Sequence, residues 1–222
     1  QTIQGKGTIA VKLNNQSAGV VNANISGQTL TIGADLTNTG EIRASNGGSL
    51  AITTTTITNV GGLIQAQTGS TVNFTSGSVI DGGTVQNSGG TFNFGSVTLD
   101  GTDTAGITLQ GTFGAPGGST VTLLNTIHNQ GSISLNSGGS TTVLKVGGDG
   151  TGVATLLDGG TITLGATGTG SVLSASSSGN RLINENNTIQ GQGIIGNSQA
   201  RLTNRGVIDA NVSGGTLVLS PD

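Results

Sequence analysis

Short segments in which apolar and polar residues alternate recur along the whole chain. Thr29–Ile32 reads Thr-Leu-Thr-Ile, and the same alternation returns at 49–53, 71–75, 91–94 and 120–124. Successive side chains of a β-strand point to opposite sides, so this pattern predicts strands with one apolar face and one face of Thr, Ser or Asn. No segment keeps a helical period between helix caps. The sequence therefore predicts an all-β protein.

A second pattern joins these strands into a repeating unit. The unit reads apolar–x–Asn/Asp–x–Gly–x–apolar–x–small, as at 36–44 in Leu-Thr-Asn-Thr-Gly-Glu-Ile-Arg-Ala. Four early glycines mark its period with spacings of 21, 21 and 22 residues: Gly19, Gly40, Gly61 and Gly83. A unit this short cannot bury its apolar face alone, and it does so by stacking on its neighbours.

We therefore expect a parallel β-helix, or β-solenoid, of about 9–11 rungs of roughly 21 residues each. Residues 1–222 are predicted to form one continuous solenoid, because no Pro-rich or charged linker divides them. An antiparallel sandwich is the structural rival, since Asn-Gly and Asp-Gly pairs such as Asn46-Gly47 favour hairpins. The repeated three-part unit favours coils over hairpins.

The Asn or Asp before the glycine of each unit is predicted to form a structural turn ladder. Short amide and carboxylate side chains tolerate left-handed backbone and bond to nearby amides. Stacked asparagines also bond to one another along the axis. The predicted ladder consists of Asn38, Asn59, Asp81, Asn129, Asp158 and Asn204.

Composition narrows the classes of function. The chain has 42 Gly among 222 residues, 8% charged residues, 32% hydrophobic residues and no Cys. The formal net charge is −3, and the seven basic residues are scattered, which argues against nucleic acid as a partner. No apolar run approaches the roughly 20 residues of a membrane helix, so membrane insertion is not expected. Without Cys there are no disulfides, which fits an exported bacterial protein without proving export.

A longer repeat relates the two ends of the chain. Residues 2–9 (TIQGKGTI) match 188–195 (TIQGQGII), and 19–30 match 206–217, so that 1–33 recur as 187–220. This suggests a module of about 187 residues, although equivalent places in one stack are an alternative explanation. Neither end has a visible polar cap. We therefore expect the solenoid to contact itself end to end, or flanking modules of the same chain.

Candidate chemistry is sparse, and we expect no catalytic site. His128, the only histidine, falls in an outward position of its unit. Asp81 and Asp100 are expected on nearby rungs, where paired carboxylates resemble those of polysaccharide-degrading β-helix enzymes. Three of the four phenylalanines are expected in the core, which leaves no aromatic platform for sugars. No cofactor is predicted, although the oxygen-rich segments 147–152 and 100–103 leave calcium open.

The unit Asn38-Thr39-Gly40-Glu41-Ile42-Arg43-Ala44, followed by Ser/Thr-Leu-x-Ile, resembles the repeats of large bacterial surface proteins of the filamentous haemagglutinin and autotransporter-passenger class. The resemblance covers nearly the whole chain and implies a right-handed β-helix at the cell surface or outside the cell. The predicted function is a non-enzymatic structural rod that forms or extends a surface fibre. The alternative is an adhesin that binds glycans or host receptors through irregular loops at 101–106, 113–119 and 147–152.

Overall fold

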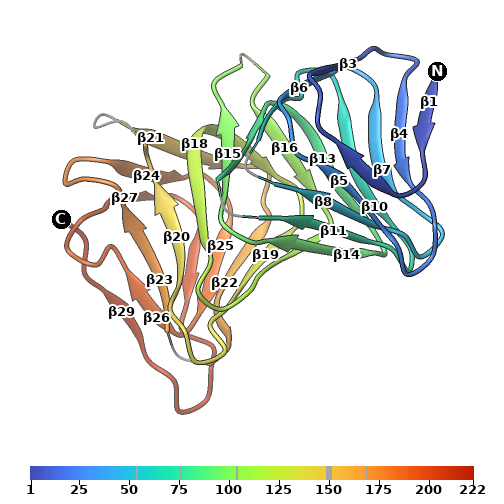
Figure 1. The fold of residues 1–222 in the computed structure, drawn as a ribbon. Helices are drawn as coiled ribbons and strands as arrows, with labels where there is room; N and C mark the ends of the chain where they lie inside the picture. The colour runs from blue at the N-terminus through green and yellow to red at the C-terminus, as the bar shows by residue number, and fades with distance from the viewer. Residues whose placement is uncertain (54, 76, 104, 149–151, 169) are drawn as a thin grey trace.

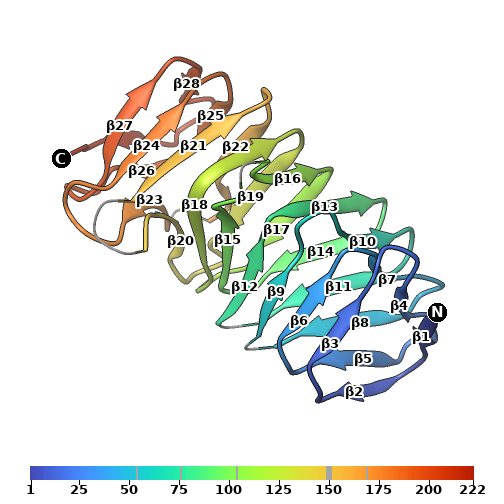
Figure 2. The ribbon, with the colours of Figure 1, turned by 90° about the horizontal axis from the view of Figure 1, so that it is seen from above.

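The computed structural model describes residues 1–53, 55–75, 77–103, 105–148, 152–168 and 170–222; the side chain of residue 166 is not described. These residues form 29 strands and no helix, and every pair of named strands is parallel. The strands stack as a β-solenoid of about 10 turns of roughly 22 residues, as predicted from the repeat. The two termini lie at opposite ends of the stack (Figures 1 and 2).

Each rung carries three strands, so the solenoid has three faces. The first face contains β1 (Thr2–Gln4), β4 (Val20–Ala23), β7 (Glu41–Ala44), β10 (Leu63–Gln67), β13 (Gly83–Ser88), β16 (Ile107–Gln110), the second half of β18 (Thr120–Asn129), β21 (Val153–Leu157), β24 (Arg181–Asn184) and β27 (Arg201–Asn204).

The second face is a separate sheet of ten strands. It contains β2 (Gly7–Ile9), β5 (Thr29–Ile32), β8 (Ser49–Ile52), β11 (Thr71–Phe74), β14 (Thr91–Phe94), β17 (Thr112–Ala115), β19 (Ser132–Asn136), β22 (Thr161–Thr167), β25 (Thr188–Gly191) and β28 (Val207–Asp209).

The third face is continuous with the first, because β18 turns the corner without a break. It contains β3 (Leu13–Asn15), β6 (Leu36–Asn38), β9 (Thr56–Thr58), β12 (Ser78–Asp81), β15 (Val97–Gly101), the first half of β18, β20 (Thr142–Val146), β23 (Ser171–Ala175), β26 (Gly193–Ile195) and β29 (Leu217–Leu219).

In-register stacking places the apolar residues of successive rungs in interior columns. On the first face Val21, Ile42, Ile64 and Val85 are register partners from rung to rung, and all four are fully buried. Pairs such as Asn46-Gly47 and Asp81-Gly82 turn corners between faces instead of closing hairpins. Asn46 and Gly47, both with positive φ, lead from β7 on the first face to β8 on the second.

Four phenylalanines fill the second-face side of the core. Phe74, Phe92, Phe94 and Phe113 are at most 2% exposed, so all four belong to the core and not only three. The rings of Phe94 and Phe113 stack with centroids 4.9 Å apart, and the Phe92 ring lies edge-on to both. Such contacts add to the free energy gained by burying the rings.

The long sequence repeat is out of phase with the turns. Its first copy places β1 on the first face and β2 on the second, whereas its second copy places β25 on the second face and β26 on the third. The register within each copy is the same: Ile3 pairs with Val21 in one, and Ile189 pairs with Ile208 in the other. The two ends therefore do not occupy equivalent places in the stack.

We expect Phe94→Ala to lower the free energy of unfolding by about 3–5 kcal/mol, because it leaves a cavity beside three rings. The control is Val60→Ala at a side chain that is 39% exposed, which should cost less than about 0.5 kcal/mol. Urea unfolding followed by circular dichroism measures both. Equal costs for the two variants would contradict a packed aromatic core.

Candidate functional site

A ladder of asparagine side chains runs inside the solenoid, at the corner where the third face leads into the first. Nδ2 of Asn15 donates to Oδ1 of Asn38 at 2.7 Å, and Nδ2 of Asn38 donates to Oδ1 of Asn59 at 2.7 Å. All three side chains are buried. Gly62 is required beside the ladder, because a Cβ there would lie 2.4 Å from both the carbonyl oxygen and Nδ2 of Asn38.

Asp81 lies beside this ladder and not within it. The strand register pairs Asp81 with Thr58 on one side and with Asp100 on the other, one position before the asparagine column. Gly82 follows in the column, and its carbonyl oxygen accepts a hydrogen bond from Nδ2 of Asn59 at 3.2 Å. The ladder therefore ends on a backbone group at this rung, and the Asp81 carboxyl lies outside.

The later members of the predicted ladder also do not form one continuous column. Asn129 is fully buried, but its Nδ2 donates to Oδ1 of Asn187 at 2.9 Å, two rungs further on. Asp158, on the intervening rung, is exposed in a left-handed turn. Asn204 accepts a 2.7 Å hydrogen bond from Asn184 in a second short ladder near the C-terminal end.

The repeat pattern missed three ladder residues: Asn15, Asn184 and Asn187. Asn15 follows Leu13 in the expected apolar–x–Asn order, but two additional residues separate it from the next glycine. Asn184 likewise follows Leu182, with six residues before the next glycine, Gly191. A search for apolar–x–Asn alone would have found Asn15 and Asn184, since the ladder asparagines are defined by their place at the end of a strand and not by a following glycine.

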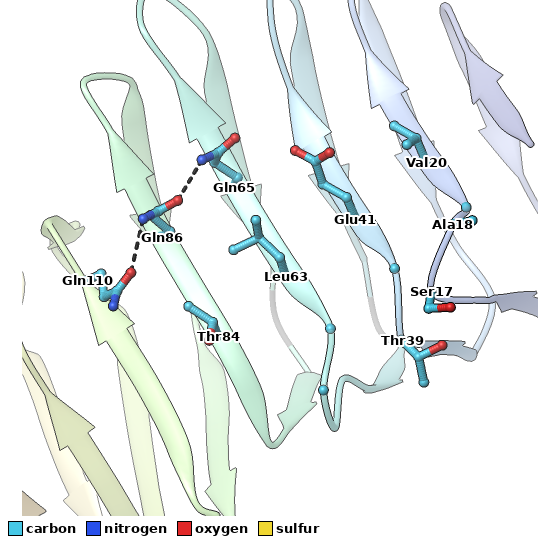
Figure 3. A pocket seen from close by; sticks show the side chains of 14 residues that line it. Ser17, Ala18, Val20, Thr39, Glu41, Leu63, Gln65, Thr84, Gln86 and Gln110 are labelled. Carbon is cyan, nitrogen blue, oxygen red and sulfur yellow. Dashed lines mark hydrogen bonds between the residues drawn. The ribbon is translucent and has the colours of Figure 1, made fainter.

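A second ladder, made of glutamines, runs along the outside of the first face. Nε2 of Gln65 donates to Oε1 of Gln86 at 2.6 Å, Gln86 donates to Gln110 at 2.9 Å, and Gln110 donates to Gln130 at 2.9 Å. Figure 3 shows the first part of this chain. Gln130 donates to the Asp158 carboxylate at 2.9 Å. An ionised carboxylate only accepts hydrogen bonds, so it orients every amide of the ladder.

The glutamine ladder forms one side of an open groove on the first face (Figure 3). The groove has a volume of about 660 Å³ and is lined mainly by small residues, hydroxyls and amides. Its one charged lining residue is Glu41, which forms an ion pair with Arg43 at 3.0 Å. No lining residue is aromatic, so the groove offers hydrogen bonds but no stacking surface.

Three carboxylates lie on neighbouring rungs where β12 and β15 end. Asp81 and Asp100 are register partners, and the Asp100 carboxylate accepts hydrogen bonds from the backbone of Thr102 at 2.9 Å and from Asn125 at 3.0 Å. Partial burial raises the pKa of Asp81 above its usual value, and the charges of Asp100 and Asp103 raise it further. The arrangement concentrates negative charge at the end of these two strands.

The structure offers little for metal chemistry in the part of the chain it describes. Within the described ranges, no group of three His, Cys, Asp or Glu side chains is arranged to hold a metal ion. Residues 149–151 of the calcium prediction at 147–152 lie outside the described residues. No helix long and apolar enough to cross a membrane occurs in the described ranges.

His128 lies on the outside of the first face, as its sequence position predicts. Its Nδ1 is 3.0 Å from Oδ2 of Asp158, on the same carboxylate that ends the glutamine ladder. The hydrogen bond from Gln130 holds the pKa of Asp158 below its usual value despite a small opposing effect of burial, and His128 lowers this pKa further. No hydroxyl nucleophile contacts His128 among the hydrogen bonds of the described residues.

One of the predicted loops, 113–119, is less irregular than the sequence suggests. Residues 113–119 are largely strand β17 and a tight turn, in which the backbone N–H of Ser119 donates to the carbonyl oxygen of Pro116 at 3.1 Å.

Comparison with known proteins gives no match: no protein-family model, no curated protein and no solved structure matches the chain. Fold and contacts define a parallel β-solenoid with polar side-chain ladders, and the likeness to bacterial surface proteins stays a prediction.

Asn38→Ala should destabilise the protein by about 1–3 kcal/mol, because it removes the side-chain acceptor of Asn15 Nδ2 and the donor to the buried Oδ1 of Asn59. Asn204→Ala is the matched control, since Asn204 is exposed at the end of its own ladder and should cost less than about 1 kcal/mol. Urea midpoints compare the two. A larger loss at Asn204 than at Asn38 would show that the interior ladder adds no stability.

Asp81→Asn should stabilise the protein at pH 7 by about 0.5 kcal/mol, a small effect because solvent screens the three charges. The folded-state pKa of Asp81 is raised, so its contribution to stability is present at low pH and is lost as the pH rises through that pKa. The stabilisation by Asp81→Asn should therefore vanish near pH ~2.5, where the Asp81 carboxyl is protonated. Urea midpoints at both pH values test this, with Asp209→Asn as a control outside the cluster.

Proposed function

We propose that this chain is a non-enzymatic structural protein of the cell surface or extracellular space, a rigid rod that forms or extends a fibre. The observation that carries the proposal is the unbroken column of buried side chains and parallel strands from one end to the other. A stack with no internal domain boundary transmits force along its axis through many backbone hydrogen bonds at once. Ten rungs at about 4.8 Å spacing give a rod about 45–50 Å long.

The ladders support a mechanical function. Amide-to-amide hydrogen bonds link rungs on the inside through Asn38 and on the outside through Gln86, in addition to the backbone bonds. Sliding one rung past another would break several of these together. The ends support assembly, because the terminal rungs leave apolar residues such as Ile3 and Leu219 exposed at 43% and 56%.

An adhesin that binds glycans is the second candidate, and the groove in Figure 3 favours it. Rows of amides and hydroxyls offer donors and acceptors to sugar hydroxyls at a repeat equal to the rung spacing. Triple replacement Gln65→Ala, Gln86→Ala and Gln110→Ala would abolish glycan-array binding that depends on this groove. The same replacement leaves the ends of the rod, and hence assembly, unchanged.

Assembly is tested by electron microscopy and sedimentation of the purified chain over a range of concentrations. We expect end-to-end pairs or filaments, with Leu219→Asp weakening association by about tenfold or more because it places a charge in the contact. Val153→Asp, on the side of the rod at 40% exposure, is the control and should not change association. Single rods at every concentration would contradict self-assembly.

A further inference from the structure

The C-terminal end of the solenoid exposes residues whose counterparts in the first repeat copy are buried. Leu219 is 56% exposed, whereas Ile32, 187 positions earlier, is fully buried. Ala210 is exposed, whereas its counterpart Ala23 is fully buried. In the first copy, the next rung covers both: Ile32 pairs with Ile52, and Ala23 pairs with Ala44. The end surface thus lacks one particular neighbour.

The two copies form the same local structure, because their corresponding residues have corresponding register partners. Gly7 pairs with Leu30 in the first copy, and Gly193 pairs with Leu217 in the second. Gln4 pairs with Asn22, and Gln190 pairs with Asp209. The strands β27, β28 and β29 at the end therefore correspond to β3, β4 and β5. In the first copy these are covered by β6, β7 and β8.

Asp222 has the position that, in the first copy, directly precedes the next rung. Asp222 corresponds to Asp35, and it lies over the preceding rung with its backbone N–H donating to Ala200 at 3.1 Å and its carboxylate 3.6 Å from Arg201. Asp35 accepts hydrogen bonds from the backbone and hydroxyl of the following rung, at Thr56 and Thr55. Asp222 can receive the same two groups from an added rung.

Charge also matches the expected neighbour. Asn22 in the first copy has Arg43 as its register partner on the next rung. The counterpart of Asn22 at the end is Asp209, a carboxylate at the exposed edge. A rung like that of β7 would therefore bring the Arg43 guanidinium opposite Asp209, where the two charges attract.

We propose that this end surface docks a second copy of the module. Leu36 of the second copy then takes the place in the stack that directly follows Asp222 of the first copy. In that arrangement β6, β7 and β8 of the second copy cover β27, β28 and β29. Because β7 lies on the first face but β28 lies on the second, each successive copy is rotated by one face. The module spans eight rungs and one face, and three copies regain the starting face. This inference rests on the proposed rod.

A tandem chain tests the proposal: residues 1–222 followed without a linker by residues 36–222. The chain contains no Cys, so engineered cysteines report only their own contact. Asp209→Cys in the first copy and Arg43→Cys in the second should form a disulfide on mild oxidation. In-register residues on adjacent strands lie about 4.8 Å apart, within the range that a disulfide spans.

The matched control keeps Arg43→Cys in the second copy and moves the first cysteine to Thr203→Cys. Thr203 lies on β27, on the first face, so this pair would form only if the second copy continued without rotation. We expect roughly tenfold or more disulfide in the first pair than in the second. Asn22→Cys with Arg43→Cys in the single chain is the positive control for the same register.

Circular dichroism and urea unfolding of each tandem variant verify that both copies are folded. The proposal is overturned if a folded tandem forms the disulfide in the Thr203→Cys, Arg43→Cys pair. It is also overturned if neither tandem pair forms a disulfide while the positive control does. These outcomes leave the proposed function intact, because a single chain is still a rod. If the single chain shows no rod in electron microscopy, the proposed function fails first and independently.

Discussion

The whole structure depends on one constraint: a rung satisfies its apolar side chains and its backbone groups only through the rungs on either side. No rung has a core of its own, because inward side chains such as Ile42 lie between register partners on the rungs above and below and belong to one shared core. Stability is therefore close to a sum over neighbouring rungs. The same constraint leaves two unsatisfied surfaces, one at each end.

The polar ladders follow from this stacking. Once strands are in register, identical side chains lie at one repeat along the axis, and an amide is the side chain that both donates to and accepts from its own copy. Asparagine does so inside the corner, where Asn15, Asn38 and Asn59 are buried, and glutamine does so outside. Burying an amide is costly unless it is hydrogen-bonded, so the inner ladder also fixes the register.

The sequence predicts the fold because its signals are local and repeated. Alternation in segments such as Thr29–Ile32 defines strands, and a period near 21 residues defines the rung. It does not predict every ladder residue: Asp81 and Asp158 match the unit, yet Asp81 lies one position before the asparagine column, and Asp158 lies exposed in a left-handed turn. Contacts such as Asn129 with Asn187, two rungs apart, depend on which rung supplies a glycine at the corner.

The sequence also does not predict on which face each copy of the long repeat begins. That face depends on the number of strands between the copies and not on the number of residues. The corner within β18 is continuous strand, so a count from the sequence pattern alone would miss one face. That the same segment folds with the same register on two different faces has a physical consequence. The repeated segment adopts the same local structure on different faces, because its contacts are with the rung before it and the rung after it. A module that advances by one face thereby distributes its outer ladders around the axis instead of along a single side.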